Sequence, residues 1–429
     1  MKKICLTVVG MYIMFLHAFS QFSNDTSAYK SKTLKLDEVN IISSYYSQKA
    51  DKSAVMGGRT DSKGIGDVTD FANGIDLRFV KWGNDKRKNT FDGGLGIDYH
   101  TAASQAYVDS NGHARNYGTR IYPTFDWTTE NESKRTSFGL GAYYSAERHF
   151  YHSLGLNTSF SKKTNHNGEF GVKLSTYLDR IKMIIPSEFS SVDSANNSSS
   201  DSIVYVTTAS GHVTEIIYRN GQQIGKSKNT TPSKPRNTFT AEFSFSQVIN
   251  QRMQGSIVVD LVEQNGYLGL PFHRVYFNNG KDTIENLPSQ RFKLPIGLRL
   301  NYFLGDNVIL RSYYRFYIDN WGLKSNTVSL EVPIKLSPFF SVSPFYRYYQ
   351  QTAAKYFAPY AVHSPDDQYY TSNYALAAFT SQSFGVGLRI APPKGILTQN
   401  LKSLEVRYAH YTQTTDLVSN VISVDLSFR

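Results

Sequence analysis

Arginine and tyrosine alternate along one short segment, in the order Arg311, Tyr313, Arg315 and Tyr317. Residues two apart in an extended strand point to the same side, so this spacing predicts one face that carries all four side chains. A guanidinium group stays charged and binds carboxylate or phosphate through paired hydrogen bonds. A row of such groups can make a pore prefer anions. In the alternative interpretation, which stays open, arginines pair with acids and tyrosines to stiffen a wall.

The opposite face of the same segment carries Leu310, Tyr314, Phe316 and Ile318. A charged side chain at lipid-facing depth costs about 2–4 kcal/mol, so the arginine face is expected to point into a lumen. Later segments repeat the alternation. The candidate pore-lining residues are Arg311, Tyr313, Arg315, Tyr317, Asp319, Arg347, Tyr349, Glu405, Arg407 and Asp425.

Other residue groups that could carry chemistry have simpler explanations. His152 and Ser153 are sequence neighbours, and neighbours in a strand face opposite sides, which is a poor arrangement for a proton relay. The glycine pairs at 64–66, 139–141 and 385–387 lack the residues of a phosphate-binding loop. We therefore predict no catalytic, cofactor-binding or metal-binding residues, and a protein that is not an enzyme.

Extended strands are needed to position these residues. Along most of the chain, apolar and polar residues alternate with the period of two that strands require. From residue 38 onward, sixteen segments of about ten residues alternate in this way, close to the length of a tilted membrane strand. The expected strands lie near 38–48, 68–80, 90–101, 117–128, 136–147, 150–161, 168–179, 237–248, 253–264, 292–303, 307–318, 326–335, 339–350, 382–390, 402–411 and 420–428.

The connections between these segments alternate in length. Odd-numbered connections are often long, above all those after the seventh and thirteenth segments, whereas even-numbered ones such as 304–306 and 336–338 are tight. Short periplasmic turns and long extracellular loops give this asymmetry in transmembrane barrels. The sequence thus predicts an all-β protein, a transmembrane antiparallel β-barrel of about 16 strands (14–18).

The composition agrees with a barrel. Aromatic residues form 14% of the 429 residues, yet charged residues form 19% and the mean hydropathy is −0.38. Aromatic girdles, a lipid-facing stripe and a polar lumen combine these properties. A soluble β-sandwich with one wet face is the alternative. The net charge of +11 is spread along the chain, which argues against nucleic-acid binding.

The first twenty residues predict an export signal. Lys2 and Lys3 precede an apolar stretch, and small residues follow at Ala18 and Ser20. Residues 21–37 are expected to be a flexible leader, and 38–429 the barrel. Cys5 is the one cysteine and lies inside the signal, so cleavage would leave no thiol. The Ser/Asn-rich stretch 180–236 is expected to be a long extracellular loop with a short hairpin, or a plug folded inward.

Several blocks resemble a known family. They include Tyr45-Tyr46-Ser47-Gln48, Asp98-Tyr99-His100-Thr101, Pro271-Phe272-His273-Arg274, Tyr314-Arg315-Phe316-Tyr317 with the residues up to Gly322, and Pro344-Phe345-Tyr346-Arg347. In this order they resemble the outer-membrane family named domain of unknown function 3570 (DUF3570). The resemblance implies an exported barrel in the cell outer membrane and transfers no catalytic residue. The Thr101–Ser104 stretch departs from the more Ser-rich pattern of the family.

The sequence predicts a channel or porin-like protein, or the membrane subunit of an envelope complex, with a preference for anions as a further hypothesis. The alternatives are an outer-membrane enzyme that acts on lipid or an envelope cofactor, and an adhesion or receptor barrel that works through its loops. Expected partners are outer-membrane lipid, the barrel assembly machinery, small anionic solutes and periplasmic proteins. The aromatic Phe428, penultimate in the chain, motivates the assembly partner.

Overall fold

The structure is a computed structural model. It describes residues 33–50, 67–83, 86–101, 117–147, 150–183, 201–207, 213–219, 222–227, 233–396 and 400–428. The expected export signal 1–20 and residues 21–32 of the expected leader lie outside the described residues. The first strand, β1, begins at Lys35.

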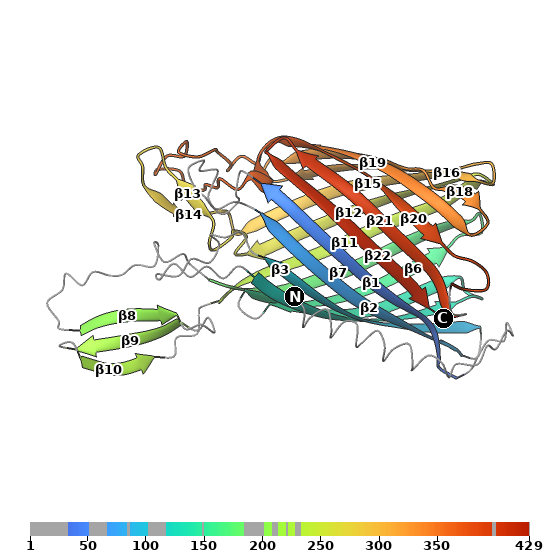
Figure 1. Cartoon of the computed structure of the whole chain (residues 1–429), viewed down its shortest axis with the longest axis horizontal. Helices are drawn as coiled ribbons and strands as arrows, with labels where there is room; N and C mark the ends of the chain where they lie inside the picture. Colours follow the sequence, from blue (N-terminus) through green and yellow to red (C-terminus); the bar gives the residue numbers. More distant parts are fainter. Residues whose placement is uncertain are drawn as a thin grey trace.

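Sixteen antiparallel strands close into one tilted barrel, which confirms the predicted fold class (Figure 1). Each expected segment coincides with one strand. Closure follows from the pairing of the first strand with the last, from Val39 opposite Phe428 to Ala50 opposite Leu417. The first half of the wall contains β1 (Lys35–Ala50), β2 (Val68–Trp82), β3 (Arg87–Thr101), β4 (Tyr117–Asn131), β5 (Thr136–Glu147), β6 (Tyr151–Lys163), β7 (Gly168–Lys182) and β11 (Ser233–Asn250).

The second half of the wall contains one interrupted strand. Both β17 and β18 pair with β16 on one side and β19 on the other, so they are two parts of the same strand. The interruption falls at Val332 and Pro333, where proline has no N–H to donate to the ladder. This half contains β12 (Met253–Gly266), β15 (Gln290–Leu304), β16 (Val308–Asp319), β17 (Lys324–Glu331), β18 (Ile334–Ser337), β19 (Phe340–Gln351), β20 (Phe379–Ile390), β21 (Leu401–Gln413) and β22 (Leu417–Phe428).

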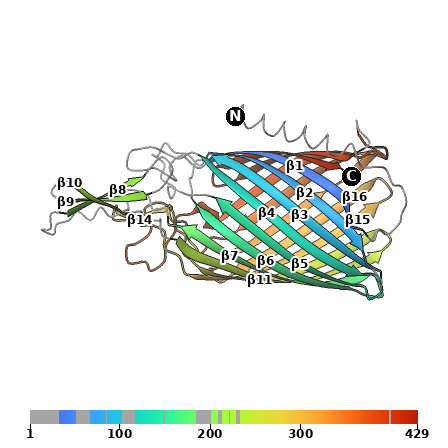
Figure 2. The ribbon, with the colours of Figure 1, turned by 90° about the horizontal axis from the view of Figure 1, so that it is seen from below.

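The connections separate into two ends, as predicted. Tight turns at the expected periplasmic end use residues in the left-handed region, including Arg135 (φ 53°), Asn167 (φ 58°) and Gly305 (φ 66°). The long connections join strands at the other end, and the described strands of the connection between β7 and β11 lie apart from the barrel wall (Figure 2). There β8 (Asp201–Thr207), β9 (Val213–Arg219) and β10 (Gln222–Ser227) pair with one another and with no described barrel strand. The expected hairpin thus has a third strand.

The outward face of the wall is apolar. Large side chains such as Phe125, Leu174 and Phe384 are each at least half exposed, on strands around the whole barrel. An exposed apolar surface of this extent is expected of a protein that lies in a membrane. Among the described residues, no helix is long and apolar enough to span a membrane.

Most of the large side chains that are fully buried lie beyond the extracellular strand ends. We call this region the cap: residues 267–289, with β13 (Arg274–Tyr276) and β14 (Asp282–Ile284), residues 352–378, with the 3-10 turn η1 (Tyr374–Leu376), and the turn 320–323. Isolated β-bridges join the two long segments, including Phe277 to His363 and Asn286 to Tyr370. Fully buried cap side chains include Pro271, His273, Val275, Trp321, Thr371 and Ser372.

The cap spans the width of the extracellular mouth. At one side the Phe272 ring lies 5.4 Å from that of Phe150, in the connection between β5 and β6. At the other side it includes the connection between β19 and β20. Eight wall strands separate these two connections in either direction, when β17 and β18 are counted as one. They therefore lie on opposite sides of the barrel.

Candidate functional site: the barrel lumen

A contact across several strands identifies the inward face. Arg407 on β21 donates to Glu331 on β17 over 3.3 Å, although β19 and β20 lie between these strands. Two side chains can meet over two intervening strands only on the concave side of the wall. Because strand residues alternate, this contact shows which residues of β17 and β21, and of the strands paired with them, point into the lumen.

The register places Arg311, Tyr313 and Arg315 of β16 on this face, whereas Tyr314 faces outward. Arg311 lies 3.6 Å from Glu331, the same carboxylate that Arg407 contacts. The Tyr313 ring packs under the Arg299 guanidinium of β15, with 5.5 Å to the ring centroid. Arg315 is exposed in the lumen.

The predicted residues of β19, β21 and β22 form two further groups. On β19, Arg347 is exposed, and the Tyr349 hydroxyl donates to Gln351 over 2.6 Å. On β21, Arg407 also contacts Glu405 over 3.0 Å. Asp425 of β22 lies opposite Glu405 in the register.

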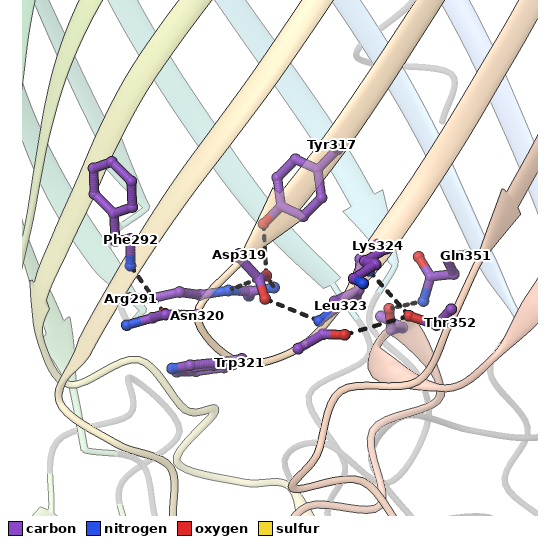
Figure 3. Close-up of polar contacts among 12 residues, drawn as sticks. Arg291, Phe292, Tyr317, Asp319, Asn320, Trp321, Leu323, Lys324, Gln351 and Thr352 are labelled. Carbon is purple, nitrogen blue, oxygen red and sulfur yellow. Dashed lines mark hydrogen bonds and ion pairs between the residues drawn. The ribbon is translucent and has the colours of Figure 1, made fainter.

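Tyr317 and Asp319 belong to a separate buried cluster at the base of the cap (Figure 3). The Asp319 side chain is fully buried, and it accepts hydrogen bonds from Arg291 Nε (2.9 Å) and from the Tyr317 hydroxyl (2.7 Å). Its other oxygen accepts from the Leu323 amide over 3.0 Å. Asp319 therefore holds the β16–β17 turn and is unavailable to a solute in the lumen.

An aromatic contact extends this cluster into the cap. The Arg291 guanidinium lies 4.4 Å from the centre of the Trp321 ring, and the indole N–H donates to the Gln290 carbonyl over 3.0 Å. The Trp321 ring then packs edge-on against Tyr356. Through these contacts the end of the barrel wall and the cap form one packed unit.

The inward arginines are more exposed than the carboxylates near them. In the described wall, the side chains of Arg389 and Arg311 are 56% and 51% exposed, whereas those of Glu405 and Glu331 are 30% and 25% exposed. Inward arginines of the exposed class are Arg78, Arg299, Arg311, Arg315, Arg347 and Arg389. The inward carboxylates include Glu38, Asp76, Asp92, Asp126, Asp260, Glu331, Glu405 and Asp425, and of these Asp76 alone falls in that class.

Acidic residues predominate on the part of the wall that β1 to β4 form. Arg120 forms an ion pair with Asp98, which also accepts from the Tyr122 hydroxyl over 2.8 Å. Lower in the barrel, Arg78 bridges Glu38 (3.1 Å) and Asp92 (2.7 Å). These arginines are held by carboxylates, in contrast to Arg299, Arg315 and Arg347.

The chain matches the family described as "Protein of unknown function (DUF3570)" over residues 89–421. This chain belongs to the DUF3570 family. The match confirms the resemblance of the sequence blocks from Asp98 onward, and it covers the wall from β3 into β22; the block at 45–48 lies outside the matched residues. No curated protein matches the chain.

This DUF3570 barrel also resembles solved outer-membrane proteins, at low sequence identity. A "Bacterial polysaccharide outer membrane secretin" is 11% identical, with 93% of this chain and 98% of that chain covered and a TM-score of 0.41. A mutant of the TodX monoaromatic hydrocarbon channel is 9% identical, with 91% and 89% covered and a TM-score of 0.41. Pseudomonas aeruginosa OpdK with vanillate is 6% identical, with 93% and 99% covered and a TM-score of 0.34.

The residues near His152 lie where strand alternation predicts. Ser153 is buried in register with Ser145, whereas its exposed neighbour His152 pairs with Ala146 and so faces the other side of the wall. Among the described residues, no group of three or more His, Cys, Asp or Glu side chains could hold a metal ion.

Sequence reasoning did not identify Arg299, Arg389 and Glu331, which complete the charged groups of the lumen. Arg299 follows the same alternation within its own segment, so that pattern could have revealed it. Glu331 could not be found in this way, because its contact with Arg407 depends on the curvature of the closed wall.

Proposed function

We propose that this protein is an outer-membrane channel for small polar solutes, with a preference for anions. The observation that carries the proposal is the difference in exposure between inward arginines and inward carboxylates. Arg299, Arg315 and Arg347 are exposed and form no ion pair with another described residue. A solute in the lumen water would meet these guanidinium groups before it met the carboxylates.

The electrostatic argument depends on water. An exposed guanidinium stays charged and can exchange hydrogen bonds from water to an anion, so it favours anions without trapping them. Recessed carboxylates that already pair with arginine, such as Glu331 and Glu405, present little free negative charge. The wall of β15, β16 and β19 would then be the path of the anions.

The test is the reversal potential of the refolded protein in a planar bilayer with asymmetric potassium chloride. We expect the sign of an anion-preferring channel, and a shift toward zero when Arg299, Arg315 and Arg347 are all replaced by Gln. Arg180→Gln is the control, because Arg180 follows the inward residue Asp179 and so faces outward. A silent inserted barrel, or a triple variant with an unchanged reversal potential, would contradict the proposal.

A second candidate is an adhesion or receptor barrel, which the packed cap favours. A folded outer surface with a dry core can present a fixed binding face, whereas a channel needs only an open path. A variant that lacks residues 352–378 should then lose surface binding to its partner while the inserted barrel persists. Retained binding would remove this candidate.

We further propose that the barrel performs no catalysis. The opposite directions of His152 and Ser153 support this, because a hydroxyl and its general base must lie within hydrogen-bond reach. The check is a phospholipid hydrolysis assay with wild type and His152→Ala. Activity that depends on His152 would refute the proposal.

Insertion by the barrel assembly machinery is also proposed, from the aromatic end of β22. Phe428 is buried and pairs with both Val39 and Leu401. Phe428→Ala should lower the fraction of heat-modifiable, inserted protein in cells; an unchanged fraction would argue against this signal.

A further inference from the structure

A cavity of about 580 Å³ opens in the lumen wall below the cap, on the side formed by β4 to β7 and β11. Its volume lies within the range of small-molecule sites, about 300–1,000 Å³. All of its lining residues except Ala142 belong to the inward face. The lining residues that the argument uses are Asp126, Tyr143, Tyr151, Asn157, Lys173 and Tyr177.

Two tyrosines and a glycine shape the cavity. The rings of Tyr143 and Tyr177 meet edge to face with centroids 6.2 Å apart. Gly155 lies between them in the register, and a Cβ at this position would lie 2.9 Å from Tyr177 and 3.2 Å from Tyr143. Any larger residue would push the rings apart. Among the described residues neither tyrosine hydroxyl has a hydrogen-bond partner, so both can bind a ligand.

The charged groups of the cavity are not equivalent. Arg236 is already paired with Asp179 over 3.1 Å, and Asp126 receives only a long hydrogen bond, 3.4 Å, from the Asn157 amide. Lys173 is exposed and forms no ion pair within the described part of the chain, although Glu242 lies across from it on β11. The cavity thus offers one cation without an ion pair, Lys173, and one carboxylate, Asp126, beside several uncharged hydrogen-bonding groups.

We propose that this cavity is a binding subsite for a small acidic sugar, such as a uronic acid. The inference rests on the proposed channel and names its substrate class. A sugar ring has an apolar C–H face that can stack on a tyrosine, and hydroxyls that Asn157, Asp126 and the tyrosine hydroxyls can bind. Its carboxylate would bind the Lys173 ammonium.

Both parts of this chemistry are needed to explain the lining. A simple inorganic anion would use Lys173 and leave the tyrosine pair without a role. A neutral sugar would use the tyrosines and Asn157 and leave the ammonium without a partner. An acidic sugar satisfies both groups.

The cavity also connects to the cap through a line of rings. Tyr151 lines it, donates to or accepts from Ser145 over 3.1 Å, and contacts the ring of Phe150 at 6.1 Å. Phe150 then contacts Phe272 of the cap. The subsite therefore lies near the extracellular entrance, where a solute would arrive first.

The test is equilibrium binding by titration calorimetry on the refolded protein in detergent micelles, which does not require conduction. The probes are glucuronate, glucose and sulfate. We expect glucuronate to bind more tightly than the other two. Equal binding of glucose would indicate a neutral-sugar site, and equal binding of sulfate would indicate charge alone; either result overturns the proposal.

Substitutions assign the two parts of the ligand. Lys173→Gln should weaken glucuronate about tenfold, the loss of one charge-assisted hydrogen bond, and leave glucose binding unchanged. Tyr143→Phe and Tyr177→Phe should weaken both sugars, because each loses a hydroxyl with little change in shape. Arg180→Gln is the matched control, since it removes one positive charge of the same strand on the outward face. Equal losses with Lys173→Gln and Arg180→Gln would overturn the assignment.

Conductance separates failure of this inference from failure of the proposed channel. A conducting protein that does not bind glucuronate refutes the subsite and leaves the channel intact. A silent barrel that binds glucuronate refutes the channel and keeps the subsite.

Discussion

Two arginine–carboxylate groups at opposite ends of the barrel have the same chemistry and different surroundings. At the cap, Arg291 contacts Asp319, and the two side chains are 13% and 0% exposed. Toward the periplasmic end, Arg78 contacts Glu38 and Asp92, and its side chain is 45% exposed. The comparison shows that access to water, more than geometry, separates a structural ion pair from a charged lumen surface.

The same contrast holds for the two regions as a whole. The wall has an apolar face toward lipid and a wet polar face inside, so it has little core of its own. The cap has a core in the usual sense, with Trp321, Val275 and Thr371 fully buried. Substitutions in the cap should therefore act on stability, and substitutions in the lumen should act on conduction.

Asp319→Ala is expected to have the largest effect. It leaves the largely buried Arg291 guanidinium without its partner, and breaking a buried pair costs about 3–5 kcal/mol. Hydrogen exchange should show loss of protection in 320–323 and 352–378, with the barrel strands still protected. Unchanged hydrogen exchange in the cap would show that the Arg291–Asp319 pair contributes no more to stability than the exposed ion pairs of Arg78.

The pH dependence of the cap is the next largest effect. Burial raises the pKa of Glu285 to about 7, from an ordinary value of 4.5, while Thr371 and the Leu270 amide donate to its carboxylate. Between pH 4.5 and about pH 7, the Glu285 carboxyl is therefore protonated in the folded cap and ionised in the unfolded cap. This stabilisation is present below pH 4.5 and is lost as the pH rises through 7, about 3 kcal/mol in total.

His273 acts in the opposite direction at lower pH. Burial and the neighbouring Arg274 lower its pKa to about 3. As the pH falls below 6.5, the His273 imidazole therefore becomes protonated in the unfolded cap while it stays neutral in the folded cap. The cap loses stability as a result. Together the two groups predict a plateau of cap stability between about pH 4.5 and 6.5, with losses on both sides.

Hydrogen exchange of residues 273–276, corrected for intrinsic rates, measures this plateau. Glu285→Gln should abolish the loss at high pH and keep the loss at low pH. A profile of Glu285→Gln that matches wild type at pH 8 would show that the carboxyl does not control the cap.

Arg78→Gln is expected to have the smallest effect on stability, within about 1 kcal/mol, because exposed ion pairs contribute little. The denaturant midpoint of the barrel should hardly change, while the salt dependence of conductance should. A loss as large as that of Asp319→Ala would show that the lumen pairs also hold the fold.

The sequence was sufficient for the wall and insufficient for the cap. Period-two alternation and turn residues such as Gly305 are local, so all sixteen strands could be predicted. The cap joins residues about ninety positions apart, such as Phe277 and His363, and nothing local marks that pairing. Asp319 was expected to line the lumen by alternation, yet its burial depends on Arg291 of another strand and on the turn that follows.

The residues of the charged lumen could likewise be predicted from the sequence only in part. Alternation in β16 was enough to group Arg311, Tyr313 and Arg315. The cavity of Tyr143 and Tyr177 required the register of three neighbouring strands, with Gly155 between the rings. Such a site appears only when the chain is closed and aligned.

The pairing of β1 with β22 has a consequence for the order of events in assembly. Until the last strand is in place, the edges of β1 and β21 both present unpaired N–H and C=O groups, which can recruit other chains. The contact that removes both edges joins residues at opposite ends of the chain, and contacts of such separation form slowly. The unpaired strand edges must therefore be shielded from other chains until the whole barrel wall is present. A truncation that removes only β22, twelve residues, would leave both edges unpaired and promote aggregation.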